Sequence, residues 1–412
     1  MNRTDKLSAI YPSYDRNSNY YDSRISRVGK AFAEEFGRTP RYFSAPGRTE
    51  MGGNHTDHQH GHVLAAAVDL DSLCAAAPNG TDTINIISEG FGRTEIELSQ
   101  AEPVPEEKNT TKAIVRGVAS TLLKKGSGGF DMYCTSDVLA GSGLSSSASF
   151  EVLLGTVING LFCGGAVSDV DIAKTGRFAE NVYFGKPSGL MDQMACAVGG
   201  VVGIDFYSEN SPVIDKADGG EVLCGYDICI IDSGASHAGL TDEYAAIPVE
   251  MGRVAAYFGK KYLSEVDEEE FFGDFKAMRK KCGDRAALRA YHFFREDKRA
   301  VEELCALKSG DTDEFLRLVN ESGRSSYMYL QNIYPSGNET HQDMAIALIA
   351  AEKLLDGKGA FRVHGGGFAG TVQAFVPRDM TAAFVAGADK YMAEGCCKAI
   401  SIRAAGGTEI TV

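Results

Sequence analysis

The sequence contains no tryptophan and only 11 prolines in 412 residues. It also contains no apolar run of the roughly 18 residues that a membrane-spanning helix needs, so we expect no membrane partner. Basic residues number 41 against 56 acidic ones, and the net charge of -15 argues against binding nucleic acid through a basic face. Residues 1–20 are polar and lack the apolar segment of a signal peptide, so we expect a cytoplasmic protein.

The ten cysteines occur at irregular spacings, and no C-x-x-C pair is present. This absence excludes a zinc ribbon and a thioredoxin-like redox motif, and we expect reduced thiols. A Walker phosphate-binding motif is also missing. In contrast, glycine is abundant at 47 residues and follows no collagen period, which indicates many tight loops in an enzyme-sized fold.

The length predicts about two domains. Strand and helix patterns mix without regular β-α-β alternation, which favours an α+β fold with antiparallel sheets. A polar, turn-rich stretch at 208–220 places the boundary, giving domains 1–210 and 211–412. In the first half we predict helices at 26–36, 111–125, 145–162 and 169–184, a hairpin of strands 83–87 and 94–98, and further strands at 42–45, 131–138 and 201–206. In the second half we predict helices at 243–260, 271–282, 297–308, 311–322, 339–355 and 381–393, and strands at 226–231, 361–363, 371–377 and 398–403.

A Gly- and Ser-rich segment runs from Gly141 to Ser149, after a predicted strand and before an apolar helix. Glycines let a backbone approach an anion, and a helix N-terminus presents free N–H groups and the positive end of the helix dipole. The segment therefore predicts a phosphate-binding loop. The alternative is a serine-rich helix cap without a ligand.

A second segment, residues 47–62, contains half of the chain's eight histidines. If this segment is a strand, then His58, His60 and His62 share one face and form a candidate transition-metal site. A solvated histidine run is the alternative. The Asn, His, Asp and Arg side chains of the same segment also suit the recognition of sugar hydroxyls.

Two further segments carry candidate chemistry. Glu180 lies on a predicted helix, and Asp192 follows a Lys-Pro-Ser-Gly turn. The two carboxylates could therefore serve as a metal ligand and as a base. The alternative is that both are ordinary surface acids. Residues 364–370 hold four glycines before a strand, which indicates a tight backbone-lined loop or a bulged hairpin.

Taken together, these segments resemble the GHMP kinase superfamily, and most closely its galactokinase family. The G-x-G-L-S-S-S-A-S segment resembles the family's phosphate loop, and H-G-G-G-F-A-G resembles its third motif, with Ala369 in place of the usual glycine. Residues 47–61 are similar to the galactokinase signature G-R-x-N-L-I-G-E-H-T-D-Y-x-x-G, residues 189–193 to G-I-M-D-Q, and residues 237–244 to a sugar-site segment. The resemblance extends from about residue 36 to residue 371.

The resemblance implies a two-domain GHMP kinase fold, with a ribosomal-protein-S5-like N-terminal domain, a ferredoxin-like C-terminal domain and the active site in the cleft between them. It implies transfer of phosphate from ATP, with Mg²⁺, to the C1 hydroxyl of a hexose such as D-galactose. ATP and a small sugar are the expected partners, and we expect a monomer or weak homodimer.

The resemblance also assigns roles to single residues. Asp192 matches the acid that takes or orients the proton of the C1 hydroxyl, and Arg48 matches the cation that stabilises charge on the transferred group. Ser147 and Glu180 match Mg²⁺ ligands. The matched sugar-binding positions are Asn54, His55, Asp57, Gly189 and Tyr244. The matched nucleotide-binding positions are Gly141, Gly143, Leu144, Ser145, Ser146 and Ser147.

The departures from the signature include Asn54 in place of Glu and His58 in place of Tyr. In galactokinases that Glu faces the sugar C6 hydroxyl, so a neutral residue there removes repulsion of a C6 carboxylate. The Asp57-His58-Gln59 run also resembles the plant galacturonate kinases, which makes a uronic acid an alternative substrate. Residues 334–341 also differ from the usual pattern. A non-catalytic sugar sensor and a histidine-based metal protein are alternatives of other classes.

Overall fold

The computed structural model describes residues 3–124, 128–138, 143–186, 188–208, 212–217, 223–236 and 239–411. Their contacts divide the chain into two compact units. Unit 1 comprises Met1–Arg48, Ala66–Gly200 and Ser401–Val412, and unit 2 comprises Thr49–Ala65 and Val201–Ile400. The chain therefore passes from one unit to the other several times. The division into domains 1–210 and 211–412 remains a proposal.

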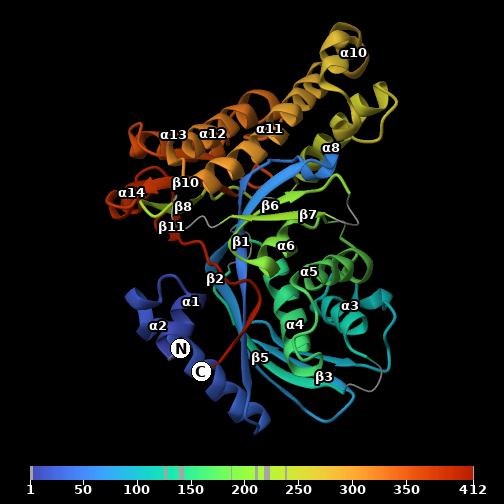
Figure 1. The fold of residues 1–412 in the computed structure, drawn as a ribbon, viewed down its shortest axis with the longest axis vertical. Helices are drawn as coiled ribbons and strands as arrows, with labels where there is room; N and C mark the ends of the chain where they lie inside the picture. Colours follow the sequence, from blue (N-terminus) through green and yellow to red (C-terminus); the bar gives the residue numbers. More distant parts are fainter. Residues whose placement is uncertain are drawn as a thin grey trace. The chain divides into compact units, whose positions relative to one another are not determined.

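Unit 1 is built on a sheet with the strand order β12-β1-β2-β5-β3-β4 (Figure 1). Its strands are β1 (Arg41–Gly52), β2 (His62–Pro78), β3 (Thr83–Ser88), β4 (Gly92–Glu97), β5 (Phe130–Ser136) and β12 (Thr408–Ile410). β3 and β4 form the predicted hairpin, with Thr83 opposite Glu97. β3 pairs with β5 in parallel, whereas β2 pairs with β5 in antiparallel orientation.

Helices cover both faces of this sheet. On one face lie α1 (Arg3–Ile10) and α2 (Tyr14–Phe36), which contact every second residue of β2, namely Leu73, Ala75 and Ala77, as the two-residue period of a strand requires. The other helices of unit 1, drawn in cyan and green in Figure 1, are α3 (Thr111–Leu122), α4 (Ser146–Phe162), α5 (Asp169–Phe178), the π-helix η3 (Ala179–Phe184) and α6 (Met191–Val198), with a short 3₁₀ turn, η2 (Pro105–Glu107). The Ser168 hydroxyl accepts a hydrogen bond from the Asp171 N–H and so caps the N-terminus of α5.

Unit 2 has a four-stranded antiparallel sheet with the order β11-β8-β10-β9. These strands are β8 (Tyr226–Asp232), β9 (Ala360–His364), β10 (Thr371–Pro377) and β11 (Cys397–Ile400). Helices α13 (Asp343–Leu355) and α14 (Thr381–Ala388) pack on it through residues such as Ala347, Leu355 and Phe384. With the sheet of unit 1, this arrangement confirms the predicted α+β class.

The polar, turn-rich stretch 208–220 contains a strand that the sequence patterns did not predict. Within this stretch β7 (Val213–Ala217) pairs antiparallel with β6 (Val201–Asp205). Most of β7 is exposed, and Val213 retains 63% of its accessible surface. Because neither face of β7 is regularly buried, the sequence lacks the alternation by which strands are recognised.

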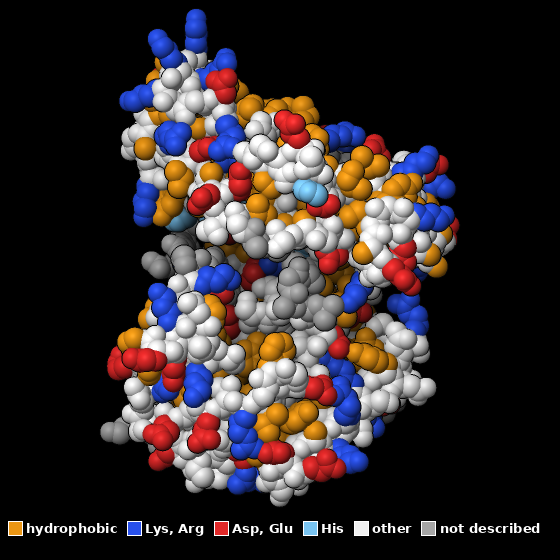
Figure 2. Space-filling model, turned by 180° about the vertical axis from the view of Figure 1, so that it is seen from behind, with side chains coloured by type: hydrophobic (Ala, Val, Ile, Leu, Met, Phe, Trp, Pro, Cys, Tyr) orange, Lys and Arg blue, Asp and Glu red, His pale blue; other side chains and the backbone are white. Residues whose placement is uncertain are grey.

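The remaining elements of unit 2 are η1 (Asp57–Gln59), α8 (Thr241–Tyr257), η4 (Leu263–Glu265), α9 (Glu268–Gly273), α10 (Phe275–Cys282), α11 (Asp284–Ser309), α12 (Thr312–Ser325) and the π-helix η5 (Ser326–Leu330). Basic side chains gather on α10, at the top of Figure 2, next to the acidic first turn of α9. No helix in the described ranges combines the length and hydropathy that crossing a bilayer requires.

Candidate active site

The phosphate-loop segment packs against the residues that begin the signature. The Arg48 N–H donates to the Leu144 carbonyl at 3.0 Å. A Cβ atom on Gly47 would lie 2.8 Å from that same oxygen, so only glycine permits this approach. Ser145 has a left-handed φ of 59°, and α4 begins directly after it. The fold therefore brings Arg48 to the N-terminus of α4.

Asp192 lies in the first turn of α6 and forms a fork with Arg48. Arg48 Nε donates to Asp192 Oδ1 at 2.7 Å and Nη2 donates to Oδ2 at 2.8 Å. The Ser145 hydroxyl donates to Oδ2 at 2.6 Å. The Asp192 side chain remains 32% exposed, whereas that of Arg48 is 10% exposed. This two-bond geometry fixes the carboxylate more rigidly than a single ion pair does.

Burial by itself raises the pKa of the Asp192 carboxyl. The positive charge of Arg48 and the hydrogen bonds from Arg48 and Ser145 outweigh burial, with a contribution from Lys186, and hold this pKa below its ordinary value. Asp192 is therefore ionised at neutral pH and can accept a proton from a hydroxyl group.

Glu180 belongs to a second group of polar side chains in unit 1. Gln193 Nε2 donates to Glu180 Oε2 at 3.0 Å and to Glu151 Oε2 at 2.9 Å, and Lys186 Nζ donates to Glu180 Oε1 at 2.9 Å. Both carboxylates are buried. Burial and the neighbouring Glu180 raise the pKa of Glu151 well above its ordinary value. The cluster thus links α4, η3 and α6.

The predicted Mg²⁺ ligands suit that ion by donor type. Glu180 supplies a carboxylate, and Ser147 supplies an exposed hydroxyl on the first turn of α4. No group of three or more His, Cys, Asp and Glu side chains among the described residues is arranged to hold a metal. Mg²⁺ usually keeps several waters and takes one or two carboxylates together with substrate phosphates, so the residues fit a site completed by a nucleotide.

Three predicted sugar-site residues of unit 2 meet at the glycine-rich turn, residues 365–367. Its successive carbonyl oxygens accept from Asn54 Nδ2 at 2.7 Å, from His55 Nε2 at 3.0 Å and from the Tyr244 hydroxyl at 2.7 Å. A Cβ on the middle glycine would lie 2.8 Å from the Tyr244 ring. The turn therefore needs glycine and forms a common support for the three side chains.

His55 is held in its neutral form. Burial, reinforced by the neighbouring His58, lowers the pKa of His55 to about 4. Because Nε2 contacts a carbonyl oxygen, it carries the hydrogen and Nδ1 is the acceptor of the ring. The residue has a left-handed φ of 61°, which is uncommon outside glycine. An accepting nitrogen beside the half-buried Asp57 suits a sugar hydroxyl.

The strand that would place His58, His60 and His62 on one face is not formed. Residues 57–59 form the 3₁₀ turn η1, and His60 adopts a left-handed φ of 59°. The His60 ring stacks on Tyr262 with centroids 3.6 Å apart, while His62 Nδ1 lies 2.9 Å from Asp297 Oδ1. The His60 and His62 imidazoles thus have different partners, and the three histidines form no common metal site.

The structure places Asn54 in the interior of unit 2, with no exposed surface. Its Nδ2 donates to Glu50 Oε1 at 2.9 Å as well as to the glycine-rich turn, and its Oδ1 accepts from Asn332 Nδ2 at 2.9 Å and Ser326 Oγ at 3.3 Å. We expected this amide to contact a substrate, but its donors and its acceptor are used within the protein.

Some predicted positions lie at the edge of what the structure describes. Gly141 of the phosphate loop and His237 of the sugar-site segment lie outside the described residues, whereas Gly143, Leu144, Ser145, Ser146 and Gly189 lie within them. The turn before α6 is tied to η3, because the Ser188 N–H donates to Asn181 Oδ1 at 2.7 Å.

Sequence reasoning missed two contributions to the site. It assigned Ser145 to the nucleotide phosphates alone, although its hydroxyl contacts Asp192. It also overlooked Glu151, which is buried in α4 beside Gln193. A signal was present, because an acid in the middle of an apolar helical run requires a buried partner.

Glu303 gives unit 2 a pH-dependent stability. It is fully buried, and neither carboxylate oxygen has a hydrogen-bond partner among the described residues. Burial and the charges of Glu296 and Glu50 raise its pKa well above the ordinary 4.5, although Arg362 and Arg299 act in the opposite direction. The folded state therefore holds this proton more tightly than the unfolded state does, and the free energy of unfolding falls as the pH rises above 4.5.

Replacing Glu303 with glutamine removes this cost, because the amide does not ionise. We expect the substitution to raise the free energy of unfolding by about 1–3 kcal/mol at pH 8 and by less at pH 5. Urea denaturation at both values measures the difference, with the exposed neighbour Glu302→Gln as control. An equal effect of Glu303→Gln at the two pH values would contradict the assignment.

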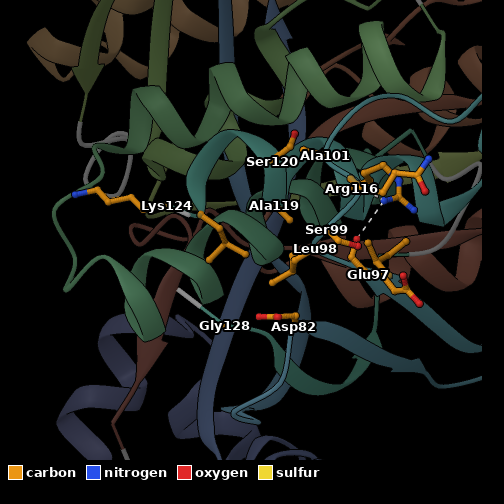
Figure 3. Close-up of a pocket in the computed structure, with 13 residues that line it drawn as sticks. Asp82, Glu97, Leu98, Ser99, Ala101, Arg116, Ala119, Ser120, Lys124 and Gly128 are labelled. Carbon is orange, nitrogen blue, oxygen red and sulfur yellow. Dashed lines mark hydrogen bonds between the residues drawn. The ribbon is translucent and has the colours of Figure 1, made fainter. Parts of the chain in front are cut away.

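A separate cavity of about 600 Å³ lies in unit 1, beside β4 and α3. Figure 3 shows Asp82, Glu97, Arg116 and Lys124 among its lining residues. Arg116 is already bound there, because Nη1 donates to the Glu97 carbonyl at 3.4 Å and Nη2 donates to Glu107 Oε1 at 2.7 Å. None of the described residues that line this cavity is a predicted site residue, so it is distinct from the arrangement around Asp192.

Comparison with known proteins agrees with the fold and with the motifs. The galactokinase galactose-binding signature matches residues 30–78, and the GHMP kinase N-terminal domain matches residues 112–200. The crystal structure of Lactococcus lactis galactokinase complexed with galactose is similar over 93% of this chain and 99% of its own, with a TM-score of 0.79 and 24% identity. Methanococcus jannaschii mevalonate kinase matches over 88% of this chain and 98% of its own, with a TM-score of 0.62 and 16% identity.

Proposed function

We propose that this chain, which is a GHMP-superfamily kinase most like galactokinase, phosphorylates a hexose at its C1 hydroxyl with ATP, and that the hexose is D-galactose. The observation that carries the proposal is the Asp192 carboxylate. Arg48 and Ser145 hold it in place and keep it ionised, while a third of its side chain remains exposed.

The proposed reaction uses these residues in defined roles. The C1 hydroxyl oxygen attacks the γ-phosphorus, its proton passes to or is oriented by Asp192, and the bond from the γ-phosphorus to the bridging oxygen of ADP breaks. Arg48 stabilises the negative charge on the transferred group. Such a reaction requires positioning and charge stabilisation more than covalent participation by the protein.

ATP and Mg²⁺ are part of the proposal. Residues 143–147 would receive the nucleotide phosphates at the N-terminus of α4, and Ser147 and Glu180 would hold Mg²⁺. When bound, the ion would neutralise charge on the phosphates. The proposal further includes a cytoplasmic location and a monomer or weak homodimer.

His55, Asp57, Gly189 and Tyr244 are the proposed sugar-binding residues. Support comes from the neutral His55, whose accepting nitrogen suits a hydroxyl group, and from the shared support of His55 and Tyr244 on the glycine-rich turn. Galacturonate is the second candidate, because the Asp57-His58-Gln59 run resembles the plant galacturonate kinases.

The proposal is tested by a coupled assay of ADP formation with D-galactose, D-galacturonate, N-acetylgalactosamine and D-glucose in parallel. Turnover with galactose in preference to the others is the expected result. Preference for galacturonate would contradict galactose as the substrate but would still support sugar kinase activity. Sugar and ATP binding without turnover would favour a sensor and contradict the proposal.

A further inference from the structure

Two residues of the signature segment are exchanged relative to the signature that it resembles. The signature G-R-x-N-L-I-G-E-H has Asn and Glu at positions four residues apart, whereas this chain has Glu50 and Asn54 at those positions. Each substitution considered alone looks like the loss of a functional group. Considered as a pair, they keep one amide and one carboxyl group and reverse their places.

The structure places these two side chains in direct contact. Asn54 Nδ2 donates to Glu50 Oε1 at 2.9 Å, and Arg362 Nη2 donates to the same oxygen at 2.7 Å. All three side chains are buried, Arg362 and Asn54 completely. The carboxylate at position 50 is thus compensated by a buried guanidinium, as a buried charge requires.

The contacts of Asn54 also fix the orientation of its amide. The Nδ2 group faces two acceptors, Glu50 Oε1 and the Gly365 carbonyl, while Oδ1 faces two donors, Asn332 Nδ2 and Ser326 Oγ. A flipped amide would place acceptor against acceptor at Glu50 Oε1 and the Gly365 carbonyl and donor against donor at Asn332 Nδ2. Residue 54 therefore joins β1, η5 and the glycine-rich turn, and its hydrogen-bonding capacity is filled.

We propose that Glu50 and Asn54 are a compensated exchange, and that Asn54 is a positioning residue for the glycine-rich turn, residues 365–367, rather than a ligand of the sugar C6 group. This inference rests on the proposed sugar site. It follows that residue 54 does not set the selectivity between a C6 hydroxyl and a C6 carboxylate, and that His55 depends on Asn54 for the placement of the carbonyl that it contacts.

Electrostatics predicts how the single substitutions behave. Asn54→Glu buries a second carboxylate beside Glu50, whose Oε1 already accepts from Arg362 Nη2, so two like charges lie close together in the interior. Glu50→Asn removes the carboxylate that Arg362 and Asn54 share. In the double variant Glu50→Asn/Asn54→Glu, one carboxylate and one amide are present again, so the variant is expected to be more stable than Asn54→Glu alone.

The test is a double-mutant cycle of unfolding by urea on the full chain. We expect a coupling between positions 50 and 54 on the order of tenfold in the unfolding equilibrium constant. Asn320 provides a control in unit 2. Its Nδ2 donates to the Gly359 carbonyl at 3.3 Å and its Oδ1 accepts from the Phe361 N–H at 3.2 Å, and it contacts no carboxylate among the described residues. Asn320→Glu should combine with Glu50→Asn additively. If the losses in the free energy of unfolding at positions 50 and 54 are additive, the two residues do not compensate each other and the proposed exchange is wrong.

The kinetic constants of the double variant distinguish a positioning role from a purely structural one, because loss of stability alone would not change the KM for the sugar selectively. We expect the KM for the sugar to rise while the KM for ATP is retained, with the ratio of kcat/KM for galactose and galacturonate unchanged. A shift of that ratio by about tenfold or more towards galactose would show that residue 54 faces C6 and would overturn the positioning role. If the natural chain phosphorylates neither sugar, the proposed function fails, while the unfolding cycle still decides the exchange.

Discussion

Replacing Asp192 with asparagine is expected to lower kcat by about 10²–10⁴-fold, the range typical for loss of a general base. Asparagine keeps the shape of the side chain but cannot accept the proton of the attacking hydroxyl. The hydrogen bond from Ser145 can persist, so the folded structure should be retained. Steady-state kinetics at saturating sugar and ATP, together with circular dichroism, measure both effects.

Asp22→Asn is the matched control, because Asp22 is an exposed aspartate of unit 1 that pairs with Arg3 at 3.0 Å. Removing a surface ion pair costs roughly 0–1 kcal/mol and should leave kcat unchanged. A kcat of Asp192→Asn within about threefold of the original protein would remove Asp192 from the reaction, because so small a change is far below the effect of a general base.

Replacing Arg48 with alanine is expected to lower kcat/KM by about 10³-fold or more, similar to the loss of an arginine that stabilises charge on a transferred phosphoryl group. The same substitution should alter the pH dependence. Arg48 is the principal group that holds the pKa of Asp192 below its ordinary value against the effect of burial. Without Arg48, burial raises this pKa, and the carboxylate becomes protonated at a higher pH.

The pH profile of kcat/KM therefore provides a second measurement on the Arg48 variants. The acid limb of the profile should move to higher pH in Arg48→Ala. Arg48→Lys keeps the charge but lacks the planar fork that makes two hydrogen bonds to Asp192, so its acid limb should lie between those of the alanine variant and the original protein. An acid limb that does not move in Arg48→Ala would contradict the ion pair's control over Asp192.

Local patterns predicted much of the secondary structure, because they depend on residues close in sequence. The β3–β4 hairpin and the Ser168 cap of α5 follow from alternation and capping rules. The helix predicted at 297–308 in fact begins at Asp284. Its early turns bury Ala286, Ala290 and Phe293 at helical spacing beside the polar Arg289 and His292, so a hydrophobic period was present and the prediction placed the start of the helix too late.

The candidate site could also be predicted only in part from the sequence. Arg48 and Asp192 were paired by resemblance, and the structure confirms their contact. The surroundings of Asn54 were not predictable, because Asn332 and Gly365 lie 278 and 311 residues away along the chain. A single substitution in a motif looks like a change of function until its partners are known, and here the partner is Glu50.

The most direct test of the account is ³¹P nuclear magnetic resonance of the product formed from ATP, Mg²⁺ and D-galactose. The account predicts the signal of galactose 1-phosphate, with phosphorus coupled to the anomeric proton, and predicts that Asp192→Asn abolishes it on the same timescale. Phosphate on another hydroxyl, or formation of inorganic phosphate alone by protein that binds both ligands, would contradict phosphoryl transfer to C1 through Asp192.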